Sequence, residues 1–161
     1  MNTRDLTGAL TTLFSELLDG APKSGAYMLN RGDQGLLRSL DYLTADAAST
    51  ARTGAASIAA HVEHLRYGLS LLNRRARGED PGADADWSAS WKTIAVSDAA
   101  WRELRNALRA EGHRWLDEMR KPRDVDEAEL NGMIGSIAHV AYHLGAIRQI
   151  DRLARGPAAT D

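Results

Sequence analysis

Strong helix formers far outnumber strand formers in this sequence. It contains 27 alanines and 20 leucines but only 4 valines and 6 isoleucines. Alanine and leucine are favoured in helices, whereas β-branched residues favour the pleated surface of a sheet. The 161 residues are enough for one domain with a sizeable hydrophobic core. The composition therefore predicts an all-α fold and a single domain over residues 1–161.

Apolar side chains recur at helical spacing in four long segments. They predict helices from Thr3 to Leu18, from Ala55 to Arg77, from just after an N-cap at Ser97 to Pro122, and from Asp126 to Leu153. A shorter helix is predicted from Asp33 to Leu43, and the small and polar residues 44–56 indicate a connection. Four long helices with one short extra helix in the first connection predict a four-helix bundle.

The segment from Gly78 to Ala95 is predicted to be a loop. It contains Pro81, Gly82 and scattered acidic residues, which disfavour regular structure. It also contains Trp87 and Trp91. We therefore expect this loop to pack against the bundle.

The charge and the lack of cysteine exclude several classes of function. Without cysteine there is no disulfide, thiolate zinc site or cysteine nucleophile. The net charge of −2 gives no general attraction to nucleic acid or to an anionic membrane, so neither is an expected partner. The apolar runs are too short for a membrane span, and the first residues lack the pattern of a signal peptide. We therefore expect a cytoplasmic protein.

His139 and His143 are spaced i, i+4 on the last predicted helix. At about 100° per residue they point within roughly 40° of each other, so both imidazoles can reach one metal ion. Small residues on the same side leave room for an open coordination position. They are Gly132, Gly135, Ser136 and Ala146. A zincin protease is excluded, because Val140 stands where that motif needs glutamate.

A second pair, His61 and His64, lies at i, i+3 on an earlier helix. One of these two side chains would complete a three-histidine site that leaves positions for water or substrate. The other would contact a ligating histidine without binding the metal itself, or have a structural role. His113 stands alone and is expected to be structural or exposed. The alternative is a purely structural bundle in which the histidines only pack.

Two segments carry a family resemblance. The segment SIAAHVEHL, from Ser57 to Leu65, resembles the second-helix motif of the DinB-like superfamily, where a serine opens the helix and a histidine followed by an aliphatic residue comes seven positions later. The segment HVAYHLGAIRQ, from His139 to Gln149, resembles its last-helix motif, H-x-x-x-H followed by a glycine and a glutamine. The resemblance extends over essentially the whole chain in helix order and loop placement. Ala56 departs from the tryptophan that often precedes the serine.

The resemblance implies a four-helix bundle with a three-histidine metal site. By the register of the two motifs, His64, His139 and His143 take the ligand positions, and His61 is a supporting residue or the alternative ligand. The cations that it implies are nickel, zinc and similar divalent ions.

The resemblance also suggests what such a site does. It implies a metal-dependent enzyme that acts on a small-molecule substrate, either by thiol-dependent S-transfer or by hydrolysis. The low-molecular-weight thiol would be one such as bacillithiol or mycothiol. Because the chain has no cysteine, any thiol must come from a cofactor or a substrate. The competing hypothesis is a non-catalytic metal-binding or stress-related interaction module.

Two further features concern partners. Arg74, Arg75 and Arg77 end the second long helix, where they either compensate the helix dipole in solvent or bind an anionic ligand. The first predicted helix is so apolar that part of its surface could face a second copy of the chain. A homodimer is therefore also expected.

Overall fold

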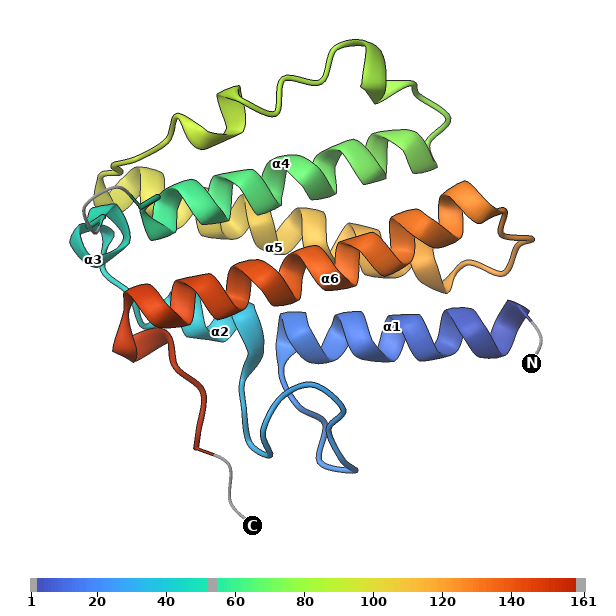
Figure 1. The fold of residues 1–161 in the computed structure, drawn as a ribbon, viewed down its shortest axis with the longest axis horizontal. Coiled ribbons are helices and arrows are strands. Elements are labelled where there is room, and N and C mark those ends of the chain that lie inside the picture. Colours follow the sequence, from blue (N-terminus) through green and yellow to red (C-terminus); the bar gives the residue numbers. More distant parts are fainter. Residues whose placement is uncertain (1–2, 52–54, 159–161) are drawn as a thin grey trace.

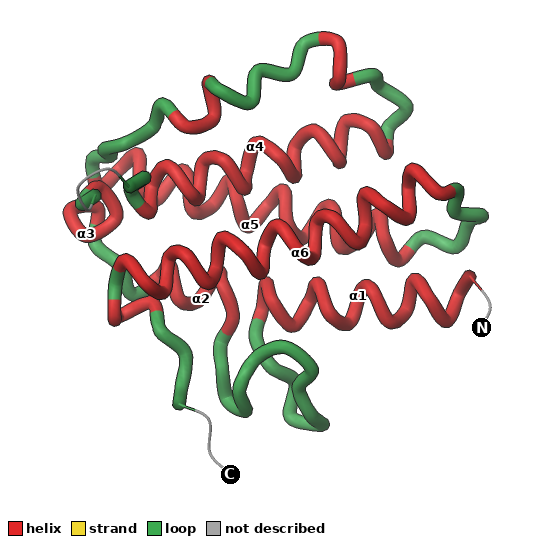
Figure 2. Tube along the Cα trace, viewed as in Figure 1, coloured by secondary structure: helices red, strands yellow, loops and turns green. Residues whose placement is uncertain are grey.

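The computed structural model describes residues 3–51 and 55–158, which contain helices and no β-strand (Figures 1 and 2). The α-helices are α1 Thr3–Asp19, α2 Gly35–Asp41, α3 Ala45–Ser49, α4 Ile58–Ala76, α5 Asp98–Arg120 and α6 Glu127–Ile150. The short 3₁₀ helices are η1 Pro81–Ala83, η2 Ala89–Trp91 and η3 Arg152–Ala154. The all-α prediction is confirmed. None of the described helices is long and apolar enough to span a bilayer.

The four long helices α1, α5, α4 and α6 follow one another in this order around the bundle. Each contacts the next, and α6 contacts α1, which closes the ring (Figure 1). The short helices α2 and α3 both pack against α5, and they also contact α1 and α4, respectively. Inward side chains such as Phe14, Leu65, Leu108 and Met133 are fully buried and form the core. The predicted bundle is confirmed, and α4 and α6 lie side by side in it.

Side-chain caps determine where three of the long helices begin. Ser57, Ser97 and Asp126 each accept a hydrogen bond from the backbone N–H three residues further on, at 3.2, 3.3 and 2.8 Å. Such caps satisfy an N–H that has no partner inside the helix. The predicted cap at Ser97 is confirmed, and Asp126 caps the helix that is predicted to begin there. Helix α4 begins at Ile58, not at Ala55, because Ser57 takes the cap position.

The prediction of a connection over residues 44–56 is wrong for Ala45–Ser49, which form α3. The side chain of Thr44 caps this helix by accepting a hydrogen bond from Ala47 N at 3.1 Å. A helix this short needs only two small residues, Ala45 and Ala48, on its buried face, so it shows no apolar periodicity. Residues 52–54 of the predicted connection lie outside the described part of the chain.

Two predicted helix ends also differ from the structure. The short helix α2 covers only Gly35–Asp41 of the segment predicted from Asp33 to Leu43. The last helix ends at Ile150, and Arg152–Ala154 turns as a 3₁₀ helix after it. The side chain of Asp151 caps that turn by accepting a hydrogen bond from Leu153 N at 2.7 Å.

Helix α1 offers little of the apolar surface on which the dimer prediction depended. Phe14 and Leu18 are fully buried within the chain, and Leu6 and Leu13 pack partly against the same core. No large apolar side chain described in α1 is exposed. The homodimer therefore stays a prediction, without support from this helix.

A buried carboxylate holds the loop that follows α1. Glu16 is only 1% exposed, and its oxygens accept hydrogen bonds from the backbone N–H groups of Tyr27, Met28 and Leu29 at 2.7 to 3.1 Å. Buried polar groups are strongly destabilising when they lose such partners. Glu16 therefore fixes the path of the loop against the bundle.

The Glu16→Gln variant is expected to lower the free energy of unfolding by about 1–3 kcal/mol. In the variant one oxygen becomes an amide NH₂, which cannot accept a hydrogen bond, and the negative charge that strengthens the remaining hydrogen bonds is lost. Even with the NH₂ at the Oε2 position, where only Tyr27 N–H donates, that second hydrogen bond of Tyr27 is lost and two donors face each other. Urea denaturation followed by circular dichroism measures the change. Glu103→Gln is the matched control, because Glu103 lies exposed on α5. Equal unfolding midpoints for the two variants would contradict the role given to Glu16.

Candidate metal centre

Four of the five histidines meet between α4 and α6. Helix α4 supplies His61 and His64, and α6 supplies His139 and His143. His139 is half-buried and the other three are buried. One nitrogen from each of His64, His139 and His143 lies within 4.8 Å of the others, so this group could hold a metal ion. His61 is not part of the group and contacts His143 from the side.

His143 lies at the centre of this arrangement. Its Nε2 is 2.9 Å from His139 Nε2, and its Nδ1 is 2.8 Å from His61 Nδ1. Two imidazole nitrogens this close need a proton between them or a cation against both, because two lone pairs repel. A proton on His143 Nδ1, donated to His61, leaves the lone pair of His143 Nε2 directed at His139. His61 then holds the ring of His143 in place.

Ser90 orients His64 from the loop that covers α4. The Ser90 hydroxyl donates its proton to the Trp87 carbonyl oxygen at 2.6 Å, so it accepts a hydrogen bond from His64 Nδ1–H at 2.7 Å. This leaves Nε2 as the free nitrogen of His64. Trp91 stacks on the His64 ring, with 4.2 Å between ring centroids and 24° between planes. The prediction that the Gly78–Ala95 loop packs on the bundle is confirmed.

The Ser90→Ala variant is expected to weaken zinc or nickel binding about 10- to 100-fold, the usual effect of removing a group that orients a metal-bound histidine. Without the hydroxyl, the His64 ring is free to rotate or to change tautomer. Competition with a coloured chelator measures the affinity. Ser88→Ala is the control, because Ser88 is exposed and bonds Asp86 instead. An unchanged affinity in Ser90→Ala would refute the orienting role.

Burial keeps these imidazoles neutral. It lowers the pKa of His61 and His139, and it is the main cause that lowers the pKa of His64 to about 4 and of His143 to about 3. Repulsion from His139 and His61 lowers the last two further. A neutral imidazole has the free lone pair that a metal ligand requires. The cluster is therefore ready to bind a cation at neutral pH.

The donor set fits a borderline divalent ion such as zinc or nickel. Imidazole nitrogen is a good ligand for both, and zinc–nitrogen bonds of about 2.0–2.1 Å place two ligating nitrogens roughly 3 to 4 Å apart. The Nε2 atoms of His139 and His143 are 2.9 Å apart, and one nitrogen from each of the three histidines lies within 4.8 Å of the others. Three neutral nitrogens without a thiolate or carboxylate would leave the full positive charge on the bound ion.

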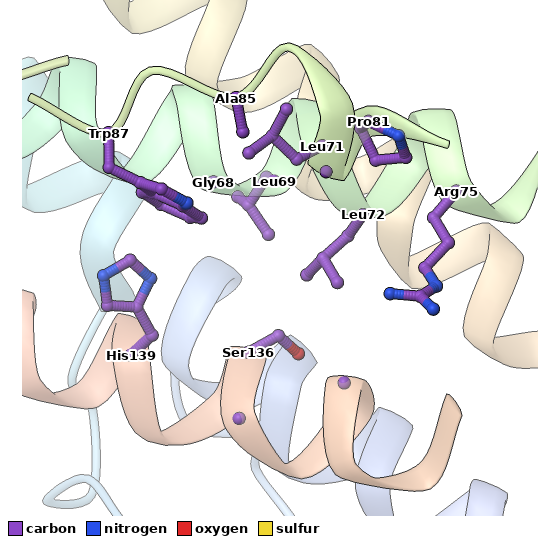
Figure 3. A pocket seen from close by; sticks show the side chains of 13 residues that line it. Gly68, Leu69, Leu71, Leu72, Arg75, Pro81, Ala85, Trp87, Ser136 and His139 are labelled. Atoms are coloured by element: carbon purple, nitrogen blue, oxygen red, sulfur yellow. The ribbon is translucent and has the colours of Figure 1, made fainter. Parts of the chain in front are cut away.

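A cavity of about 460 Å³ lies against this group, between α4, the loop segment around η1, and α6 (Figure 3). His139 lines it at one end. Of the small residues predicted to leave room beside the imidazoles, Gly132, Gly135 and Ser136 line the cavity and Ala146 does not. Gly68 contributes from α4. Three of the four small residues named from the sequence therefore do lie beside free space next to the histidines.

His113 lies apart from the cluster, as predicted. Its Nε2 is 2.8 Å from the Asp19 Oδ1 atom, so it joins α5 to the end of α1. The contributions of Ser90 and Trp91 were missed by the sequence reasoning. The only signal for them was the expected packing of the loop that contains them.

These features define a four-helix bundle with a candidate three-histidine metal centre on two facing helices. The family model of the DinB superfamily matches residues 28–147, well over half of the sequence. The chain therefore belongs to the DinB superfamily. Searches among curated proteins and among solved structures gave no significant match.

Proposed function

We propose that this protein is a metal-dependent enzyme in which His64, His139 and His143 hold one divalent cation. The observation that carries the proposal is the position of His139, which belongs to the histidine group and also lines the cavity. Structural zinc sites are closed by four protein ligands, whereas catalytic sites keep a position open. The group contains three histidines and faces a space large enough for a small molecule.

Nickel or zinc is the proposed cation. When bound, it supplies Lewis acidity and lowers the pKa of a water or thiol that it contacts. The chain's own residues hold the ligands and shape the site: Ser90 orients His64, and His61 orients His143. The largely apolar walls of the cavity give the reacting groups a less polar environment than bulk water. A cytoplasmic location belongs to the same proposal.

The proposed reaction is thiol-dependent S-transfer or hydrolysis of a small molecule. In S-transfer, the sulfur of a low-molecular-weight thiol loses its proton and bonds to an electrophilic carbon, while the displaced group leaves with its electron pair and takes up a proton from the solvent. Because the chain contains no cysteine, the thiol is supplied from outside. In hydrolysis, water takes the place of the thiol.

Metal analysis and a reaction screen test this function. Protein purified without added metal, and then supplied with nickel or zinc, should hold about one cation per chain. The loaded protein should then turn over members of a thiol-transfer panel or a hydrolysis panel. A bound cation without turnover on either panel would favour the non-catalytic module. Failure to take up either ion would rule out the metal site.

A further inference from the structure

The walls of the cavity are mostly apolar. Leu69, Leu72 and Trp87 face it from α4 and the covering loop, and Pro81 closes it from above (Figure 3). The Ser136 hydroxyl also lies near the wall, but it already makes two hydrogen bonds within the protein. It accepts a hydrogen bond from the Trp115 indole N–H at 2.9 Å and donates one to the Met133 carbonyl oxygen at 2.7 Å. An apolar body therefore fits beside Ser136 without breaking either of these hydrogen bonds.

An imidazole and a guanidinium lie at opposite ends of the cavity. His139 stands at one end, next to Trp87, and Arg75 at the other (Figure 3). A Cβ atom placed on Gly68 would be 3.5 Å from both His139 and Trp87, so Gly68 marks the histidine end on α4. Gly68 and Arg75 are seven residues apart, which is about 10 Å along a helix. A ligand that touches both ends is therefore elongated.

Arg75 differs from the arginines beside it. Arg74 and Arg77 are both paired with Glu79, at 2.7 and 2.8 Å. The exposed guanidinium of Arg75 has no ion-pair or hydrogen-bond partner in the described part of the chain, and Arg75 lines the cavity. A guanidinium binds a carboxylate through two parallel hydrogen bonds. Of the arginine cluster, Arg75 is thus the member suited to an anionic ligand.

We propose that the cavity binds a small organic acid with an elongated apolar body, oriented with its carboxylate on Arg75 and its other end at the histidine group. This inference rests on the proposed function, because it names the class of substrate for the same site. It assigns orientation of the substrate to Arg75, and it places the apolar body against the part of the cavity wall that Gly135 forms. The reacting part of the substrate lies at the end remote from the carboxylate.

Calorimetric titration of the full chain, as purified, tests the proposal with octanoate, octanol, octylamine and acetate. Octanoate is expected to bind at least about tenfold more tightly than octanol, because a charge-assisted hydrogen bond adds to the same apolar contact. Octylamine and acetate should bind more weakly still. In Arg75→Gln the preference for octanoate over octanol should disappear. In the control Arg77→Gln, which makes the same charge change outside the cavity, it should persist.

Two glycines of α6 provide a matched test of location. A Cβ atom on Gly135 or on Gly145 would meet nothing within 4 Å, so a larger side chain fits the helix at either position. Only Gly135 lines the cavity. Gly135→Leu is therefore expected to weaken octanoate and octanol binding by about tenfold or more, as loss of several buried methylene contacts implies. Gly145→Leu should leave both unchanged.

Repeating the titrations after chelator treatment separates this proposal from the proposed function. If a bound cation holds the carboxylate, the preference for octanoate over octanol should disappear after chelator treatment and persist in Arg75→Gln. That result overturns the role of Arg75. Equal binding of octanoate and octanol by the unmodified chain, or binding that survives Gly135→Leu, overturns the proposal as well. The protein could also take up neither nickel nor zinc, yet lose the octanoate preference in Arg75→Gln and bind more weakly in Gly135→Leu. That result supports the proposal and rejects the metal site.

Discussion

The His143→Ala variant is expected to lose zinc or nickel binding by more than about a hundredfold. Removing a residue that only orients a ligand already costs about 10- to 100-fold in affinity, so removing a ligand should exceed that range. His143 also contacts every other histidine of the cluster, with ring centroids 4.5 to 5.1 Å away. Metal content after dialysis and competition with a coloured chelator both measure the loss.

Two other histidines provide graded controls for this prediction. His113→Ala should bind metal as the unmodified chain does, since His113 pairs with Asp19 outside the cluster. His61→Ala should fall between the two, within the range of an orienting residue. If His61→Ala loses as much affinity as His143→Ala while His64→Ala loses little, His61 is the ligand on α4. Circular dichroism and urea denaturation show whether each variant keeps its fold.

The sequence was most informative where one helix determines the geometry alone. His139 and His143 converge because a helix places residues four apart on the same face, whatever surrounds them. The caps at Ser97 and Asp126 are equally local, since each needs only the next three residues. These features require no knowledge of the tertiary structure.

The other features of the site depend on how the helices and the covering loop pack against one another. The directions of His61 and His64 differ by about 60° around α4, so the rotation of this helix in the bundle decides which of them joins the group. That rotation follows from how α4 packs against α3, α5 and α6. Ser90 reaches His64 only because a long loop folds back over α4, and no residue spacing encodes that contact. Arg75 likewise stands out only once Arg74 and Arg77 are seen to be paired.

The second large effect expected is a loss of stability of the metal-free protein as the pH falls from 7 to 5. Burial lowers the pKa of His64 to about 4 and of His143 to about 3, whereas the pKa of both in the unfolded chain is about 6.5. Between these values the unfolded chain binds protons that the folded chain excludes, so acid favours unfolding. Each of the two residues contributes up to about 1.4 kcal/mol per pH unit below 6.5, and nothing above it. At pH 5 the sum reaches up to about 4 kcal/mol, a large part of an ordinary domain's stability.

Urea denaturation of chelator-treated protein at several values between pH 5 and 8 measures this effect. Carboxylates elsewhere also begin to titrate near pH 5, and the double variant His64→Gln/His143→Gln separates their contribution, because it keeps them and removes the two imidazoles. Its stability should fall less steeply than that of the unmodified chain below pH 6.5, and the two slopes should agree above it. Saturating zinc should stabilise only the unmodified chain, by about 3 kcal/mol at one hundred times the dissociation constant. This gain should persist from pH 8 to pH 5, because His64 and His143 of the folded protein stay neutral over that range. Parallel profiles for the two proteins would mean that the cluster is solvated well enough to accept protons, and the neutral, metal-ready state inferred for it would be wrong.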